Sequence, residues 1–119
     1  MSFADLDYVR HILDETRYLQ TASAGLEQTK FIRDETLRRA FVRSIGIIGE
    51  AARHVSEQFQ NKYPAIEWRS MAGMRNRLIH NYLGVDYDIV WDVVTNKVPA
   101  LRNELERVLQ QESRTQRDG

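Results

Sequence analysis

The chain has 119 residues, close to the usual length of one domain, and its 42% hydrophobic and 29% charged residues exclude a disordered polymer. Its 17 basic residues balance 17 acidic ones, so any site for a polyanion must be local. The lack of cysteine excludes disulfides, thiolate nucleophiles and sulfur-ligated metals. Because no signal peptide pattern or long apolar run occurs, we expect a cytoplasmic protein with no membrane partner. We expect one domain over residues 1–111 and a disordered tail over residues 112–119.

Two helices are predicted in the first half of the chain. Apolar residues recur at helical spacing from Leu6 to Leu19, which predicts a helix over about residues 5–24. Asp34 is a suitable N-cap for a second, long helix that extends to about Gln60. The apolar face of this helix is formed by Leu37, Phe41, Ile45, Ile48, Ala52, Val55 and Phe59. Their steps of three and four predict one continuous helix up to the loop before Pro64.

Three further helical patterns follow in the second half. A third helix is predicted over about residues 67–82. Its candidate core residues are Trp68, Met71, Leu78 and either Met74 or Ile79, and Asn81 and Gly84 are its candidate terminators. Asp86 can cap a fourth helix, whose β-branched residues would also permit a strand but whose flanks favour a helix. Pro99 is either the first-turn residue of a last helix or a kink that joins this helix to the fourth. About five helices with short connections predict an all-α antiparallel bundle.

Residues 74–82 read Met-Arg-Asn-Arg-Leu-Ile-His-Asn-Tyr and concentrate polar side chains beside the apolar stripe of the third predicted helix. A histidine with an ordinary pKa of about 6.5 exchanges protons near neutral pH, and an arginine binds phosphate through paired N–H groups. His80 and Arg75 could therefore cleave RNA through attack of the ribose 2′-hydroxyl on the adjacent phosphorus, with a base and a cation in place of a metal ion. We expect no metal and no cofactor, and we expect DNA to be resistant.

Helix geometry limits how these residues can meet. At about 100° per residue, Tyr82 lies roughly 20° from Arg75 around an ideal helix, whereas His80 lies roughly 140° away and close to Asn76. One straight helix cannot point both Arg75 and His80 at the same phosphate. Either the helix distorts before Asn81, or a second copy of the chain supplies the other group across a two-fold axis. We favour a homodimer in which two symmetry-related helices line one cleft.

The spacing of Arg75, His80 and Tyr82 is R-x4-H-x-Y, and this pattern resembles the signature of the HepT-like HEPN ribonucleases. The resemblance extends over about residues 40–101. It includes Ile47-Ile48-Gly49-Glu50-Ala51-Ala52, Pro64, Trp68, Gly73-Met74-Arg75-Asn76, Asp86 and Trp91. The resemblance implies metal-independent cleavage of RNA, with tRNA as a candidate substrate, in a cleft that both protomers of a homodimer form.

The resemblance also implies residue roles, a partner and a means of control. Arg75 and His80 would be the catalytic residues, with Asn76 orienting His80 and Glu50 in a supporting role. The chain would be the toxin of a type VII toxin–antitoxin system, partnered by a minimal nucleotidyltransferase antitoxin of the MntA kind. That antitoxin would transfer AMP from ATP to the motif tyrosine, Tyr82, and the added nucleotide would block the RNA site by its bulk and charge.

Plainer interpretations of the same residues remain open. Arg75 could pair with Glu50 of the neighbouring helix, where Gly46 and Gly49 would permit a close approach, and Asn76 could face water. Ordinary surface roles fit His11 and His54, and Arg77 is either a solvated surface cation or a cation that faces the RNA. At the level of function, one alternative is a non-catalytic HEPN module that binds a nucleotide or presents substrate to a nucleotidyltransferase. Another is a helical scaffold without a cleft.

Overall fold

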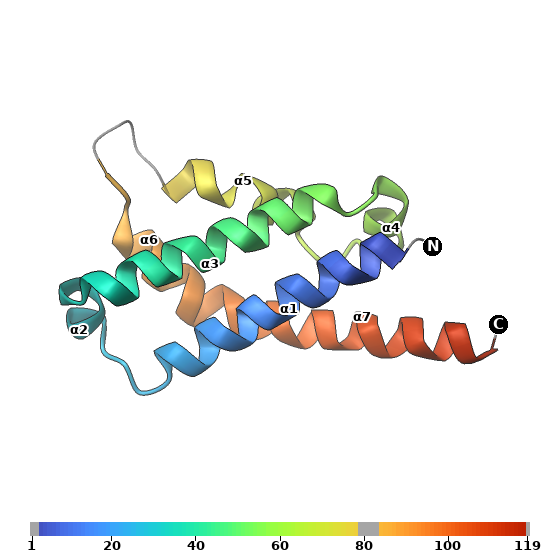
Figure 1. Cartoon of the computed structure of the whole chain (residues 1–119), viewed down its shortest axis with the longest axis horizontal. Coiled ribbons are helices and arrows are strands. Elements are labelled where there is room, and N and C mark those ends of the chain that lie inside the picture. The colour runs from blue at the N-terminus through green and yellow to red at the C-terminus, as the bar shows by residue number, and fades with distance from the viewer. Residues whose placement is uncertain (1–2, 79–83, 119) are drawn as a thin grey trace.

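The computed structural model describes residues 3–78 and 84–118, which form a bundle of helices (Figure 1). The elements are α1 (Phe3–Ser23), α2 (Gln28–Arg33), α3 (Glu35–His54), α4 (Glu57–Lys62), α5 (Trp68–Leu78), α6 (Tyr87–Asp92), the π-helical segment η1 (Val93–Lys97) and α7 (Val98–Asp118). The predicted all-α fold is confirmed over these residues. Among the described helices, none combines the length and apolar character that crossing a membrane requires.

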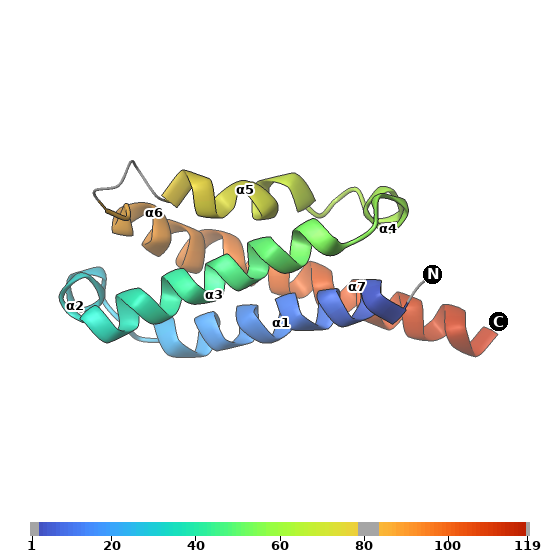
Figure 2. The ribbon, with the colours of Figure 1, turned by 45° about the horizontal axis from the view of Figure 1, so that its top comes forward.

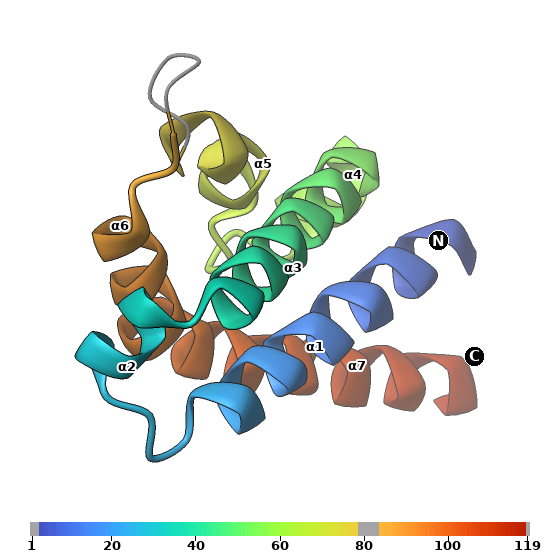
Figure 3. The ribbon, with the colours of Figure 1, turned by 60° about the vertical axis from the view of Figure 1, so that its left-hand side comes forward.

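Neighbouring long helices run in opposite directions. α3 packs against α1 and also against α5, and α7 packs against α1 (Figures 1 and 2). Figure 3 shows α3 between α5 and α1. α5 therefore contacts the bundle mainly through one face, and the polar residues at the margin of that face lie beside α3.

The apolar core follows the predicted helical periodicity. Its largest fully buried apolar side chains are Ile12, Leu19, Phe31, Phe41, Ile45, Leu78 and Leu105. Trp68 and Met71 are buried as well, which confirms the predicted inner face of α5, and Met74 is partly buried. The alternative core residue Ile79 lies outside the described residues. Burial of this face fixes how α5 is rotated about its axis and thus which residues it presents beside α3.

The single long helix predicted from Asp34 to about Gln60 is wrong, because the chain breaks between α3 and α4. Asp34 does cap α3, since its side chain accepts from the backbone N–H of Leu37 at 3.0 Å. At the break, the carboxylate of Asp5 accepts from the backbone N–H and from the hydroxyl of Ser56, each at 2.8 Å. Ser56 then caps α4 by accepting from the N–H of Phe59. The break thus depends on a contact with α1, and the apolar periodicity of residues 34–60 gives no sign of this contact.

The short helix α2 was not predicted from the sequence. It carries the fully buried Phe31, whose ring stacks on Phe41 of α3 with centroids 4.9 Å apart. A helix of six residues is unstable by itself, so tertiary packing decides whether it forms. Two of its six side chains are basic and Phe31 is its one buried residue, so the apolar pattern of α2 is too short to predict a helix.

From Tyr87 the chain is helical without interruption to Asp118. Asp86 caps α6 as predicted by accepting from the N–H groups of Asp88 and Ile89. Pro99 lies in the first turn of α7 and has no N–H to donate. The turn before it is widened, with the N–H of Val98 donating to the carbonyl of Val93. Both interpretations of Pro99 hold in part, since it begins the last helix and joins it to the fourth.

The end of α7 differs from the expected disordered tail over residues 112–119. Helix α7 continues to Asp118, and Glu112 is only 1% exposed. The Glu112 carboxylate accepts from Nζ of Lys62 at 2.8 Å and from the hydroxyl of Tyr63. Burial by itself raises the pKa of Glu112, but the hydrogen bonds from Lys62 and Tyr63 outweigh burial and hold this pKa below its ordinary value. Because this contact is made by charged and polar side chains, the apolar pattern of the sequence gives no sign of it.

We expect Glu112→Gln to lower the free energy of unfolding by about 1–3 kcal/mol at pH 7, because Lys62 and Tyr63 lose a charged acceptor. A lowered folded-state pKa stabilises the fold above the ordinary glutamate pKa of about 4.3, and this stabilisation disappears as pH falls through the folded-state pKa. In urea unfolding, the difference between wild type and Glu112→Gln should therefore shrink between about pH 7 and pH 3.

The matched control is Glu104→Gln on the same helix, whose ion pair with Arg107 is exposed and should contribute less than about 1 kcal/mol. A difference for Glu112→Gln that stays constant with pH would contradict the charge of Glu112 as its source.

Candidate functional site

Gly49 allows α5 to lie close to α3. A Cβ atom on Gly49 would be 2.8 Å from the backbone oxygen of Met71, closer than side chains approach in real structures. One turn earlier, a Cβ atom on Gly46 would meet nothing within 4 Å. The close approach expected at these two glycines is confirmed at Gly49, whereas Gly46 leaves open space beside the contact.

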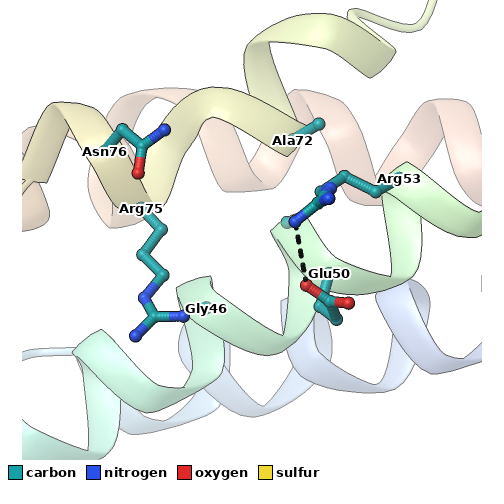
Figure 4. Close-up of a pocket in the computed structure, with 7 residues that line it drawn as sticks. Gly46, Glu50, Arg53, Ala72, Arg75 and Asn76 are labelled. Carbon is teal, nitrogen blue, oxygen red and sulfur yellow. Dashed lines mark ion pairs between the residues drawn. The ribbon is translucent and has the colours of Figure 1, made fainter.

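This open space is part of a pocket of about 330 Å³ between α3 and α5 (Figure 4). Its lining is Gly46, Gly49, Glu50 and Arg53 from α3, and Ala72, Arg75 and Asn76 from α5. The pocket is at the lower end of the range of small-molecule sites, about 300–1,000 Å³. The structure thus brings Arg75, Asn76 and Glu50, three of the predicted site residues, to one pocket.

Glu50 is engaged by its own helix. One carboxylate oxygen lies 3.5 Å from Nη1 of Arg53, and the other lies 3.1 Å from Nε2 of His54. These residues follow Glu50 by three and four positions, the spacing at which helix side chains meet. Within the described residues Glu50 makes no ion pair with Arg75, so the pairing that the plain interpretation of Arg75 required is not observed.

The pocket is locally cationic although the chain has no net charge. The guanidinium groups of Arg53 and Arg75 share it with one carboxylate, that of Glu50. In the part of the chain that the structure describes, the side chain of Arg75 makes no hydrogen bond and no ion pair, and it extends toward Gly46 (Figure 4). An exposed arginine with free N–H donors beside open space can bind an anion such as a phosphate.

Two predicted site residues, His80 and Tyr82, lie outside the described residues, as does Asn81. The described residues on either side of this segment are joined by a hydrogen bond, in which the backbone N–H of Asp86 donates to the carbonyl of Leu78 at 2.8 Å. Leu78 is the last residue of α5, one turn after Arg75. Leu78 and Asp86, described residues on the two sides of the segment, are therefore both close to the turn that carries Arg75 and Asn76.

The opposite side of α5 borders a different hollow. This hollow, of about 490 Å³, lies between α5 and the region of η1 and α7, and Met71, Met74 and Arg77 are among its lining residues. Arg77 is therefore separated from the pocket of Arg75, in agreement with its predicted surface role. The two other histidines of the sequence, His11 and His54, are exposed as predicted.

Arg53 is the pocket residue that the sequence reasoning missed. Its signal was available, because it follows Glu50 by three positions and must lie on the same side of α3. The described residues contain no group of three or more His, Asp or Glu side chains that could hold a metal ion.

Comparison with known proteins supplies the family. The sequence profile described as "Ribonuclease HepT-like" matches residues 12–108. A protein named "Putative RNase" in Caldanaerobacter subterraneus subsp. tengcongensis is 40% identical over 105 residues, which cover 88% of this chain and 94% of that protein. Another "Putative RNase", from Methanocaldococcus jannaschii, is 43% identical over 102 residues, covering 86% of this chain and 84% of the relative.

A third relative is named "Probable ribonuclease HepT", from Thermococcus cleftensis, and is 32% identical over 102 residues, covering 86% of this chain and 93% of that protein. No solved structure matches the chain. The profile match spans α3, the pocket and α5, together with the segment that contains His80 and Tyr82. The chain therefore belongs to the HepT-like ribonuclease family.

Proposed function

We propose that this chain is an RNA endonuclease that cleaves without a metal ion, and that the pocket between α3 and α5 binds the RNA backbone. One observation carries the proposal most directly. Arg75 lines an open pocket with no partner among the described residues, because Glu50 is held by Arg53 and His54. The guanidinium of Arg75 therefore keeps its N–H donors for an anion that enters the pocket. Membership of a ribonuclease family supports RNA as the anion.

In this mechanism His80 removes the proton of a ribose 2′-hydroxyl, and the freed oxygen attacks the adjacent phosphorus. A bond from phosphorus to the 2′-oxygen forms as the bond to the 5′-oxygen of the next nucleotide breaks; that 5′-oxygen takes a proton from water, and His80 returns its proton to the solvent. The products are a 2′,3′-cyclic phosphate and a 5′-hydroxyl. Arg75 stabilises the added negative charge on the phosphoryl oxygens.

Asn76 and Glu50 have supporting roles in this proposal. Asn76 lies in the same pocket as Arg75 and is exposed, so its amide is available to orient His80 or the ribose. Glu50 acts through Arg53, with which it makes an ion pair, and through His54, with which it makes a hydrogen bond, and this differs from the direct contact with Arg75 that the sequence suggested.

We further propose that the active unit is a homodimer. On one ideal helix His80 and Arg75 point roughly 140° apart, so two symmetry-related copies of α5 would allow Arg75 of one protomer to act with His80 of the other. Mixed dimers test this directly. An inactive Arg75→Ala chain and an inactive His80→Ala chain should regain part of the activity when combined, because one of the two sites in a mixed dimer is intact.

The first experiment is incubation of the purified chain with tRNA and with a single-stranded oligoribonucleotide in the presence of a chelator. We expect cleavage of RNA to products with 2′,3′-cyclic phosphate ends. A DNA strand of the same sequence, or an RNA with one 2′-deoxynucleotide at the cut position, should resist at that position. Failure of the unmodified chain to cleave any RNA would contradict the proposal, and saturable nucleotide binding would then favour the non-catalytic module.

Regulation by adenylylation is the third part of the proposal. We propose that the chain is the toxin of a type VII toxin–antitoxin pair in the cytoplasm and that a nucleotidyltransferase antitoxin transfers AMP to Tyr82.

With antitoxin and ATP, intact mass spectrometry should show wild type gaining one AMP, and RNA cleavage should fall in proportion to the modified fraction. Tyr82→Phe should gain no mass. Tyr18→Phe is the matched control at an exposed tyrosine and should be modified like wild type; equal modification of Tyr82→Phe would assign the reaction to another residue.

A further inference from the structure

We propose that Arg53 is a second RNA-binding residue of this site and that it binds the phosphate of a nucleotide adjacent to the one held by Arg75. This inference rests on the proposed ribonuclease function. It starts from the pocket itself, where Arg53 and Arg75 are the two basic residues of the lining. Neither the motif of the family nor its spacing draws attention to Arg53, which lies on α3 rather than on α5.

The separation of the two arginines favours two phosphates over one. The side chain of Arg75 extends toward Gly46, whereas Arg53 and the Glu50 carboxylate with which it pairs lie together at the other end of the pocket (Figure 4). Gly46 and Arg53 are seven residues apart on α3, a rise of about 10 Å along the helix axis. This rise separates backbone positions, so a single phosphate would contact both guanidinium groups only if both side chains turned toward it. A chain with regularly repeated phosphates can occupy both ends of the pocket.

The contact between Arg53 and Glu50 is of a kind that substrate can replace. The two side chains are 65% and 60% exposed, and the closest atoms are 3.5 Å apart. A phosphate offers Arg53 two parallel hydrogen bonds, which are shorter and stronger than this contact. Glu50 would keep its hydrogen bond with His54 after Arg53 turns toward the RNA. Glu50 therefore holds Arg53 at the pocket in the free protein and competes with RNA for it.

The test measures RNA binding in a His80→Ala background, where substrate stays intact. Arg53→Gln should raise Kd for a single-stranded oligoribonucleotide about fivefold, and the slope of log Kd against log salt should fall by about 0.7, the value for one lost phosphate contact on a single strand. Glu50→Gln should act in the opposite direction and lower Kd, because it frees Arg53. The Glu50→Gln gain should vanish when Arg53→Gln is also present.

The matched control is Arg39→Gln on the same helix, since Arg39 makes an exposed pair with Glu35 and does not line the pocket. Arg39→Gln should change neither Kd nor the salt slope. Equal effects of Arg39→Gln and Arg53→Gln, or an unchanged salt slope in Arg53→Gln, would overturn the assignment. Either result can occur although wild type cleaves RNA. In that case the assignment of Arg53 is wrong and the ribonuclease proposal still holds. If wild type does not cleave RNA, it is the ribonuclease proposal that fails.

Discussion

Replacement of His80 by alanine is expected to lower kcat/KM for RNA cleavage by about 10²–10⁴-fold, the contribution of a positioned acid or base to proton transfer. Arg75→Ala should lower it by about 10²–10³-fold, because the charge that develops on the phosphoryl oxygens loses its donor. Arg75→Lys should be intermediate, since lysine keeps the charge but lacks the planar pair of donors. Initial rates on a labelled oligoribonucleotide measure these effects.

Two controls make the result specific to the site. Arg77→Ala removes a neighbouring exposed cation that borders the other hollow. Because it removes only a surface charge, it should change kcat/KM by less than about threefold. Arg75→Ala and Arg75→Lys should also unfold near the temperature of wild type, because Arg75 is exposed and its side chain makes no hydrogen bond or ion pair within the described residues. Cleavage by His80→Ala at the wild-type rate would contradict the assignment of the proton transfer to His80.

The second large effect is expected for Gly49→Ala. The added Cβ atom would lie 2.8 Å from the backbone oxygen of Met71, so α5 must move away from α3. Overpacking of this kind costs about 1–3 kcal/mol of unfolding free energy. Displacement of catalytic groups by about 1 Å can lower the rate about 10²-fold, so kcat/KM should fall far more than stability alone explains. Thermal unfolding and RNA cleavage on the same preparation separate the two effects.

Gly46→Ala is the matched control for stability. It sits on the same helix, gains the same helix propensity of about 1 kcal/mol, and meets nothing within 4 Å. It should therefore unfold at the same or a higher temperature than wild type. If Gly49→Ala were as stable as Gly46→Ala, the close contact between α3 and α5 would not be a constraint on the site.

The parts of the fold that were predictable from sequence are those set by local signals. Apolar periodicity located the long helices, and Asp34 and Asp86 were correctly identified as caps because the residue that caps is next to the helix it stabilises. The break after α3 was missed because its cause, the Asp5 carboxylate on Ser56, comes from a residue 51 positions away in the chain. The end of α7 was misjudged for the same reason, since Glu112 contacts Lys62 and Tyr63 at the end of α4, about 50 positions earlier in the chain.

The sequence by itself determined the helical class, the family motif, and Arg75, His80 and Tyr82 as the candidate residues for chemistry. Only the tertiary structure decided which of the charged residues have side chains available to bind a substrate. It showed that Glu50 is engaged with Arg53 and His54, that Arg75 has no partner among the described residues, and that Arg53 shares its pocket. The physical reason is that a helix pattern records which side of a helix is buried, whereas ion pairing depends on distances of a few ångströms set by packing.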